Sequence, residues 1–361
     1  MNIERALDRR FMGFRSILGL NFWRKAVMDI IKSRDASFAD KIWCLRHGFT
    51  VSQLNVYGRE ELKVNYKDYM SSKQYYQLHP INGMFSLWID DKITVKHMLA
   101  PFSEYTPKYY FDIEDGEAIR LPECPDMVKN DGYEGILELL RAEGILALKQ
   151  VLGRFGIGFY RLEYIQGRYY ITGKESTADE MMDLLKSLNY YLVTEFVVNH
   201  ETIRRIYPGS TNTIRLLIGK CNGEYVLLRS FMRFGNSSSH GVDNAHAGGL
   251  EAIIDEETGQ VLFAVQLDAK GHATRISEHP DTGVSFDIKI PRWDEVVGKC
   301  MDICRSLPEL RYLGFDVVIT QDGFKIIEIN SLSGLVAAQL KAPLLRDEKT
   351  RKVYEGFGLK V

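Results

Sequence analysis

The chain has 361 residues, of which 45% are hydrophobic and 26% are charged, and its formal net charge is −2. A chain of this length can bury a sizeable core in two or three lobes. The near-neutral charge argues against nucleic-acid binding, no apolar run reaches transmembrane length, and the first residues lack the pattern of a signal peptide. No zinc-like CxxC pair occurs among the scattered cysteines, Cys44, Cys124, Cys221, Cys300 and Cys304. We therefore expect a cytoplasmic globular protein with reduced thiols.

Residues 1–85 are predicted to form a helical, polar-aromatic region. The first 35 residues contain eight Lys or Arg and four Asp or Glu, with large apolar side chains between them. This composition favours a helical extension packed on the main body. The alternative is an amphipathic helix at a membrane surface, which would place the chain at the inner face of a membrane.

The next segment alternates short helices and strands. We predict helices over 91–99, 136–142 and 177–188, and strands over 109–113, 144–149, 159–165, 168–172 and 190–197. Further strands are predicted over 211–218, 225–234 and 250–254, and an amphipathic helix over 293–306. β-meanders mixed with helices are typical of an α+β fold rather than of a doubly wound parallel sheet.

A lysine and a glycine-bearing turn follow one another after the strand 144–149. Lys149 ends the strand, and Gly153, Gly156 and Gly158 lie in the connection to the next strand. Glycines allow backbone N–H groups to approach phosphate oxygens, and an ammonium group adds positive charge. The pattern is neither a Walker loop nor the dinucleotide fingerprint, so taken alone it favours an ordinary β-turn.

The strand Tyr191-Leu-Val-Thr-Glu195-Phe-Val197 is apolar except for one acid. A buried carboxylate is costly unless it is paired or hydrogen-bonded. Glu195 and the backbone beside it are suited to the donors and acceptors of an adenine ring. The alternative is an ion pair with a neighbouring Lys or Arg.

Arginines interrupt two of the later apolar strands. Arg215 lies within Asn212-Thr-Ile-Arg-Leu-Leu217, and Arg233 ends Arg229-Ser-Phe-Met-Arg233. A guanidinium group on the inner face of a sheet indicates recognition of phosphate or carboxylate, and a solvent-facing side chain is the alternative. The small polar residues of 235–249 form a long loop, typical of a lid or a disordered segment, in which Asn244 is a candidate for substrate contact.

The final predicted unit is a β-hairpin over 313–330. Gly323 is expected to take a left-handed conformation in a three-residue loop. Alternation then places Asp316, Glu328 and Asn330 on one sheet face, with Asp316 opposite Glu328. Two carboxylates and an amide oxygen suit Mg²⁺, and a solvated polar face is the alternative.

Taken together, these motifs resemble the ATP-grasp superfamily over about residues 85–345. The matching features are Asp91-Lys92 at a helix start, Lys149 with its glycine loop, Thr194-Glu-Phe-Val197, and Asp316 followed by Glu328-x-Asn330. The succession of Asn212-Thr-Ile-Arg215, Arg233, Asp243-Asn244 and Gly248-Gly249 is most similar to the sugar-transfer-associated ATP-grasp subfamily, found with bacterial polysaccharide biosynthesis genes. Departures from the pattern are Gln150, Arg154 and Phe155, where proline or small residues are usual.

The resemblance implies two α+β lobes that grip ATP, with a small lobe over 86–200, a large lobe over 201–361 and the helical extension over 1–85. It implies ATP and Mg²⁺ as cofactors, with the metal held by Asp316, Glu328 and Asn330. Nucleotide binding is implied for Lys92, Lys149, Gly153, Gly156, Gly158, Glu195, Phe196 and Val197, with Glu201 as a candidate for the ribose. Catalytic roles are implied for Arg215, Arg233 and Asn244.

The same resemblance implies a reaction in which ATP activates a carboxylate as an acylphosphate and an amine displaces the phosphate. We expect small-molecule carboxylate and amine substrates, and sugar-linked compounds such as uronic acids are among the candidates. A phosphotransferase acting on a hydroxyl group is the alternative, and a non-catalytic nucleotide-binding partner of a glycosyltransferase is a third hypothesis. Under each of these three hypotheses, the N-terminal region is the expected contact with a membrane or a glycosyltransferase.

Overall fold

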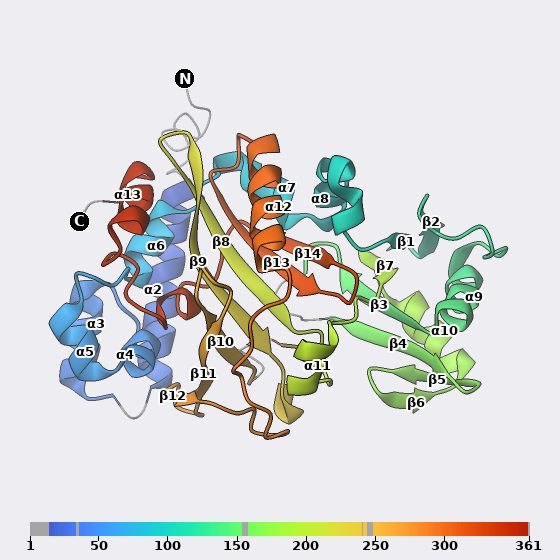
Figure 1. The fold of residues 1–361 in the computed structure, drawn as a ribbon, viewed down its shortest axis with the longest axis horizontal. Helices are drawn as coiled ribbons and strands as arrows, with labels where there is room; N and C mark the ends of the chain where they lie inside the picture. The colour runs from blue at the N-terminus through green and yellow to red at the C-terminus, as the bar shows by residue number, and fades with distance from the viewer. Residues whose placement is uncertain (1–13, 34–35, 154–157, 240, 244–247, 360–361) are drawn as a thin grey trace. The chain divides into compact units, whose positions relative to one another are not determined.

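The computed structural model describes residues 14–33, 36–153, 158–239, 241–243 and 248–359 (Figure 1). Its contacts divide the chain into two compact units. The large unit contains Met1–Asp90, Glu201–Ile319 and Glu328–Val361, and the small unit contains Asp91–His200 and Thr320–Ile327. Each unit is built on a seven-stranded sheet. The predicted α+β class is confirmed.

The N-terminal part of the large unit is helical, as predicted. Its helices are α2 (Phe14–Lys32), α3 (Phe38–His47), α4 (Val51–Tyr57), α5 (Arg59–Asn65), α6 (Ser72–Leu78), η1 (Gly83–Phe85) and α7 (Ser86–Asp90). Three of them begin with a capping box at Ser37, Thr50 or Ser71. The side chain of this residue accepts from the backbone amide of the third helical residue, whose own side chain accepts from the backbone amide of the capping residue. These caps set the boundaries of helices that are each too short to be stable alone.

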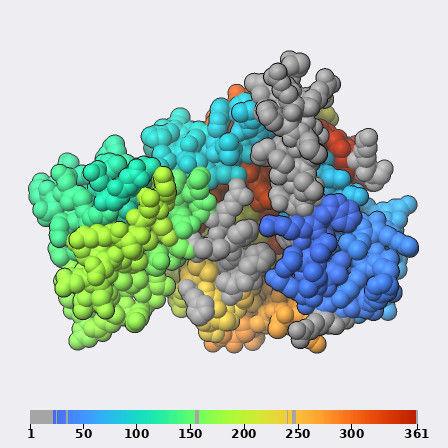
Figure 2. All heavy atoms as spheres, turned by 180° about the vertical axis from the view of Figure 1, so that it is seen from behind, coloured from blue at the N-terminus to red at the C-terminus, as the bar shows by residue number. Residues whose placement is uncertain are grey.

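The N-terminal helices are fastened to residues far along the chain within the same unit. Asn55 donates to the Lys270 carbonyl over 2.9 Å, and Asn82 donates to the Tyr312 carbonyl over 2.7 Å. In the space-filling view the blue helices lie beside the orange segment that contains Lys270 (Figure 2). Among the described residues, no helix is both long and apolar enough to span a bilayer.

The small unit holds an antiparallel sheet with the strand order β2-β1-β7-β3-β4-β5-β6. Its elements are α8 (Lys92–Met98), η2 (Ala100–Tyr105), β1 (Tyr109–Glu114), β2 (Glu117–Arg120), α9 (Gly132–Glu143), β3 (Ile145–Gln150), β4 (Tyr160–Ile165), β5 (Arg168–Ile171), β6 (Lys174–Ser176), α10 (Ala178–Ser187) and β7 (Tyr191–Glu195). Leu146 and Leu148 of β3 pack in one core with α9 and α10. Since neighbouring strand residues face opposite ways, Lys149 lies on the sheet face away from that core.

The second half of the large unit holds the other sheet, in the order β12-β11-β10-β9-β8-β13-β14, apart from the first residues of β14, which belong to the small unit. Its elements are α11 (Glu201–Ile206), β8 (Thr213–Cys221), β9 (Glu224–Phe234), η3 (Ser237–Ser239), β10 (Leu250–Ile254), β11 (Val261–Leu267), β12 (Ala273–Ile276), α12 (Trp293–Ser306), β13 (Tyr312–Ile319), β14 (Phe324–Asn330), η5 (Ala337–Gln339) and α13 (Glu348–Gly356). Helix α12 packs on β9 and buries Cys300 and Cys304, as expected for core cysteines.

One face of this sheet is apolar at one end and charged at the other. Leu217, Phe231 and Tyr312 pack with Val353 and Tyr354 of α13 in one core. Alternation along β8, β9 and β13 puts Arg215, Arg233 and Asp316 on the same face as those apolar side chains. The charged end is therefore a continuation of the core face and not a solvent-facing surface.

The hairpin of β13 and β14 forms where it was predicted, but its turn closes differently. Gly323 was expected to be left-handed, and its φ angle lies outside that region. Thr320 explains the difference, because its backbone N–H donates to the Gly323 carbonyl over 2.9 Å and its hydroxyl accepts from the Gly323 amide over 3.1 Å. A side-chain hydroxyl that closes the turn removes the need for a left-handed residue.

Candidate active site

Five charged residues meet at the polar end of the large sheet, and we call them the arginine–carboxylate cluster: Arg215, Arg233, Asp243, Glu251 and Asp316. Strand register assembles it. Asp316 of β13 is paired with Arg215 of β8, and Arg233 of β9 is paired with Thr213 of β8 and with Glu251 of β10. Residues from four adjacent strands thus share one face of the sheet (Figure 1).

Both arginines bind the carboxylate of Asp316. Arg215 donates to Oδ1 through Nε and to Oδ2 through Nη2, the latter over 2.9 Å. Arg233 approaches Oδ2 through its own Nη2 at 2.8 Å. The side chains of Asp316 and Arg215 are only 3% and 8% exposed. Such fork-shaped contacts fix both guanidinium groups in one orientation.

Thr213 links Arg233 to a second acid. Its hydroxyl accepts from Nε and Nη2 of Arg233, over 3.0 Å and 2.6 Å, and donates to Oδ2 of Asp243. The backbone amide of Thr213 also donates to this oxygen, over 2.8 Å. Asp243 lies 3.8 Å from Nε of Arg233. This threonine, which sequence reasoning passed over, helps to orient the guanidinium group of Arg233.

Burial and neighbouring charges together lower the pKa of Asp316 and raise the pKa values of Asp243 and Arg233. Burial opposes ionisation of Asp316, but Arg215 and Arg233 outweigh it by attraction and hydrogen bonding, so the pKa of Asp316 is lowered. Burial raises the pKa of Asp243 despite the opposing attraction of Arg233. The pKa of Arg233 is raised, because burial is outweighed by the acids around it.

Glu251 is a member of the cluster that the sequence analysis missed. It is 6% exposed, and burial raises its pKa to about 8 against the attraction of Arg233 and Arg215. A lone acid in the apolar strand Leu250-Glu-Ala-Ile-Ile254 is the same signal that singled out Glu195. Applied to β10, that signal would have found it.

The donor set predicted for Mg²⁺ fits a hard cation in its chemistry. Asn330 lies beside Asp316, with 3.4 Å between Nδ2 and Oδ2, and alternation puts half-buried Glu328 on the same side of β14 as Asn330. Carboxylate and amide oxygens are the ligands that Mg²⁺ prefers. In the described part of the chain no group of three His, Cys, Asp or Glu residues has metal-binding geometry. Asp316 would share its carboxylate between the arginines and the cation.

Two small features hold the end of β14 in place. A Cβ atom on Gly314 would lie 1.8 Å from the Ser333 hydroxyl and 3.5 Å from Cδ of Arg215, so only glycine leaves room for both side chains. Ser331, directly after Asn330, donates from its amide and its hydroxyl to the carboxylate of Asp90, over 3.1 Å and 2.8 Å. These contacts fix the loop beside Asn330.

In the small unit the structure brings two predicted nucleotide-binding residues together. Lys92, at the start of α8, donates through Nζ to the Gly153 carbonyl over 3.0 Å. Asp91 caps this helix by accepting from the Thr94 amide over 2.7 Å. Lys149 is half-buried on β3, opposite Leu192.

The glycine loop is described at its two ends. Gly158 has a φ of +72°, and a Cβ there would lie 2.4 Å from the Tyr191 hydroxyl, so this position requires glycine. Gln150, at the position where proline is usual in the resembled pattern, donates to the same hydroxyl over 3.2 Å. Gly156 lies outside the described residues.

Glu195 ends β7 and is bound to the backbone of the neighbouring segment. Its carboxylate accepts from the Lys108 amide over 3.1 Å, while its own amide donates to the Lys108 carbonyl over 2.9 Å. The contact of Glu195 is therefore with backbone atoms, and not the ion pair with a Lys or Arg that was the alternative to adenine binding. Half-buried Phe196 and buried Val197 follow the strand.

The two remaining predicted residues are Glu201 and Asn244. Glu201 starts α11 in the large unit, where its 64% exposed side chain pairs with Arg205 over 2.6 Å. This contact does not test the ribose-binding role of Glu201, which stays a prediction. Asn244 lies outside the described residues, although Asp243 beside it belongs to the cluster.

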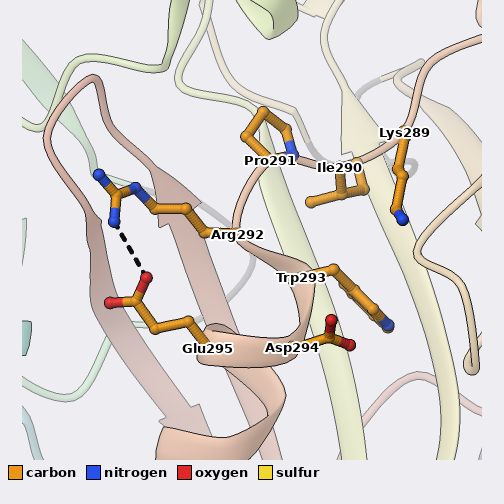
Figure 3. A pocket seen from close by; sticks show the side chains of 7 residues that line it. All are labelled: Lys289, Ile290, Pro291, Arg292, Trp293, Asp294 and Glu295. Atoms are coloured by element: carbon orange, nitrogen blue, oxygen red, sulfur yellow. Dashed lines mark hydrogen bonds and ion pairs between the residues drawn. The ribbon is translucent and has the colours of Figure 1, made fainter.

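A pocket of about 350 Å³ lies elsewhere in the large unit, around the turn that leads into α12 (Figure 3). Lys289–Glu295 line it, and Arg292 crosses the turn to pair with Glu295 at 3.0 Å. None of the predicted site residues is among those that line it.

Comparison with known proteins identifies the family. No protein of curated function matches the chain. Among solved structures, D-alanyl-alanine synthetase A from Vibrio cholerae O1 biovar eltor is similar at 12% identity and a TM-score of 0.41, over 78% of this chain and 63% of that one. The L-amino acid ligase from Bacillus licheniformis is similar at 9% identity and a TM-score of 0.40, over 74% and 48%.

A third similar structure is the N5-carboxyaminoimidazole synthetase from Staphylococcus aureus complexed with ADP, at 11% identity and a TM-score of 0.37, over 80% of this chain and 58% of that one. The chain thus spans less than two thirds of the length of these structures. The family model described as sugar-transfer associated ATP-grasp matches residues 71–352, which is most of the chain. This protein therefore belongs to the sugar-transfer associated ATP-grasp family.

Proposed function

We propose that this protein is an ATP- and Mg²⁺-dependent ligase that joins a carboxylate to an amine through an acylphosphate. In the proposed first step a carboxylate oxygen bonds to the γ-phosphorus and the bond to ADP breaks. In the second, the amine nitrogen bonds to the acyl carbon, phosphate leaves and the amine loses a proton. Family membership supports ATP as the phosphate donor, and the nature of the two substrates is our inference.

The single observation that carries the proposal is the convergence of the largely buried Arg215 and Arg233 on Asp316. Two fixed guanidinium groups stabilise charge on a transferring phosphoryl group without reorganising during the reaction. Their effect is strong because burial lowers the local dielectric constant. We assign both arginines to the phosphoryl group and the acylphosphate.

We further propose that the small unit binds the nucleotide. Lys92 and Lys149 neutralise phosphate charge, and the backbone amides of the glycine loop approach phosphate oxygens. The ammonium of Lys92, which already contacts the carbonyl of Gly153, would orient that loop. The segment Glu195–Val197 is assigned to the adenine.

For the cation we assign Asp316, Glu328 and Asn330. A bound Mg²⁺ would neutralise phosphate charge and orient the transferred group. Asn330 is held in position by the Asp90 carboxylate, which binds the amide and hydroxyl of the next residue. Asp316 connects the two arginines to this donor set.

The decisive experiment incubates the protein with Mg-ATP, a panel of carboxylic acids that includes uronic acids and amino acids, and hydroxylamine. A ligase releases ADP and free phosphate and converts the activated acid to a hydroxamate. A phosphotransferase would leave the phosphate on a hydroxyl group and form no hydroxamate.

Glu328→Gln provides the matched control. We expect it to abolish Mg²⁺-dependent turnover and to leave the circular dichroism spectrum unchanged, since Glu328 is only half-buried. Absence of ADP release by the wild-type protein with every acid would refute the proposed function. Normal turnover by Glu328→Gln would refute the assignment of the cation ligands.

A further inference from the structure

Glu251 differs from the other acids of the arginine–carboxylate cluster in having an unsatisfied oxygen. Asp316 accepts from both arginines and Asp243 accepts from Thr213. Among the described residues, no hydrogen-bond donor reaches Oε2 of Glu251, although the residue is 94% buried. A buried acceptor without a donor is unfavourable, so a ligand that donates to this oxygen would restore a missing hydrogen bond.

The neighbouring strands do not supply the missing partner. Arg233 is directly opposite on β9, but its Nε and Nη2 atoms are directed to Thr213 and Asp316. On the other side, β11 places the apolar Val265 opposite Glu251. The cluster also has three acidic groups and two guanidinium groups, so with every group ionised it holds one surplus negative charge. Both observations indicate that the missing partner is a cation that donates hydrogen bonds.

We propose that Glu251 binds the nucleophilic substrate of the reaction, and that this substrate is a primary amine that binds as its ammonium form and passes one proton to the Glu251 carboxylate before its nitrogen attacks the acyl carbon. The inference rests on the proposed function, because it places the amine beside Arg233, which we assign to the acylphosphate. An ammonium group supplies both the hydrogen-bond donors and the charge that the cluster lacks. A hydroxyl substrate would supply the donor but no positive charge.

The raised pKa of Glu251 is consistent with this assignment. Burial holds a proton on the carboxyl group to a pH of about 8, with Arg233 and Arg215 opposing and Asp243 and Asp316 reinforcing the effect. Without substrate, that proton provides the positive charge that an ammonium group would provide on binding.

The test compares a charged and an uncharged nucleophile in wild type, Glu251→Gln and the control Glu257→Gln, whose side chain is exposed on the turn after β10. Methylamine is cationic at neutral pH and hydroxylamine is not. With an acid that forms hydroxamate and saturating Mg-ATP, we expect Glu251→Gln to raise KM for methylamine about tenfold or more, which is the loss of a charge-assisted hydrogen bond. The KM values for hydroxylamine, ATP and Mg²⁺, and all values for Glu257→Gln, should stay within about twofold of wild type.

Three kinetic outcomes would overturn the proposal while leaving the ligase function intact. The first is an unchanged KM for methylamine in Glu251→Gln. The second is an equal loss with both nucleophiles, which would indicate a general structural defect. The third is a raised KM for Mg²⁺ instead, which would make Glu251 a metal ligand.

A binding measurement on the wild-type protein decides the matter without turnover. Methylammonium chloride should raise the melting temperature above that in sodium chloride at equal ionic strength, because a ligand that binds only the folded state stabilises it. No difference between the two salts would overturn the proposal. If wild type forms no hydroxamate with any acid, the proposed function fails, and this measurement still tests the cation site at Glu251.

Discussion

Replacing Asp316 by Asn tests whether this carboxylate holds the two arginines in place. The substitution keeps the shape of the side chain and removes its charge. It leaves Arg215 and Arg233, whose side chains are 8% and 16% exposed, facing a neutral amide. The amide also presents two donors where the guanidinium groups need acceptors.

The size of the effect follows from the burial of the three side chains. Removing one partner of a buried ion pair typically costs about 3–5 kcal/mol, since the remaining charge is uncompensated. Asp243 lies 3.8 Å from Arg233 and offsets part of this loss, so we expect a value near the lower end, about 3 kcal/mol. With a urea m value of about 1–3 kcal/mol per M, the unfolding midpoint should fall by roughly 1–3 M.

The assay is urea unfolding of the protein without nucleotide and with EDTA, followed by circular dichroism. Glu328→Gln is the matched control on the neighbouring strand, and we expect it to change the free energy of unfolding by less than about 1 kcal/mol because Glu328 is half-buried. If Asp316→Asn unfolds at the wild-type urea concentration, the carboxylate does not anchor the arginines. Lost turnover with unchanged stability would then restrict Asp316 to the cation.

Three further outcomes are expected. Lys149→Ala should weaken ATP binding about tenfold or more, measured by calorimetry, and an unchanged affinity would remove Lys149 from the nucleotide site. Burial lowers the pKa of His79 to about 4 against its hydrogen bond to the Tyr75 carbonyl. His79 binds its proton at a higher pH in the unfolded chain than in the folded protein. The free energy of unfolding should therefore fall by about 3 kcal/mol as the pH drops from about 6.5 to about 4. Urea titrations at each pH should show this step in wild type and not in His79→Gln. Gly314→Ala should lower the free energy of unfolding by about 1–3 kcal/mol through its clash with Ser333, and the added substitution Ser333→Gly should recover most of it; additive losses would contradict the proposed steric conflict.

The sequence was most informative where periodicity and residue type agree. The helix 293–306 and the strand 250–254 have the predicted bounds, because an amphipathic stripe and a short apolar run each fit one kind of element. Alternation along the strands left open whether Arg215, Arg233 and Asp316 face the core or the solvent, and their burial in the structure decides for the core face.

Other features depend on pairing between distant strands, which periodicity does not reveal. The strand β11 (Val261–Leu267) was not predicted, although its apolar residues pair with β10 and β12. Thr213 became visible as a site residue only through the register of β8 and β9. The backbone contacts of Glu195 with Lys108 likewise join residues 87 positions apart.

The way the chain is divided between the two units bears on its synthesis. The small unit is nearly continuous, from Asp91 to His200, and can begin to pack while the ribosome is still adding residues. The large unit cannot complete its packing until its C-terminal segments have been translated. Tyr57 is hydrogen-bonded to Val336, Met70 to Gln339 and Asn82 to Tyr312. The N-terminal helices, which are made first, are therefore among the last to be buried, and until β13 and η5 have been translated their apolar faces are available to chaperones and to other nascent chains.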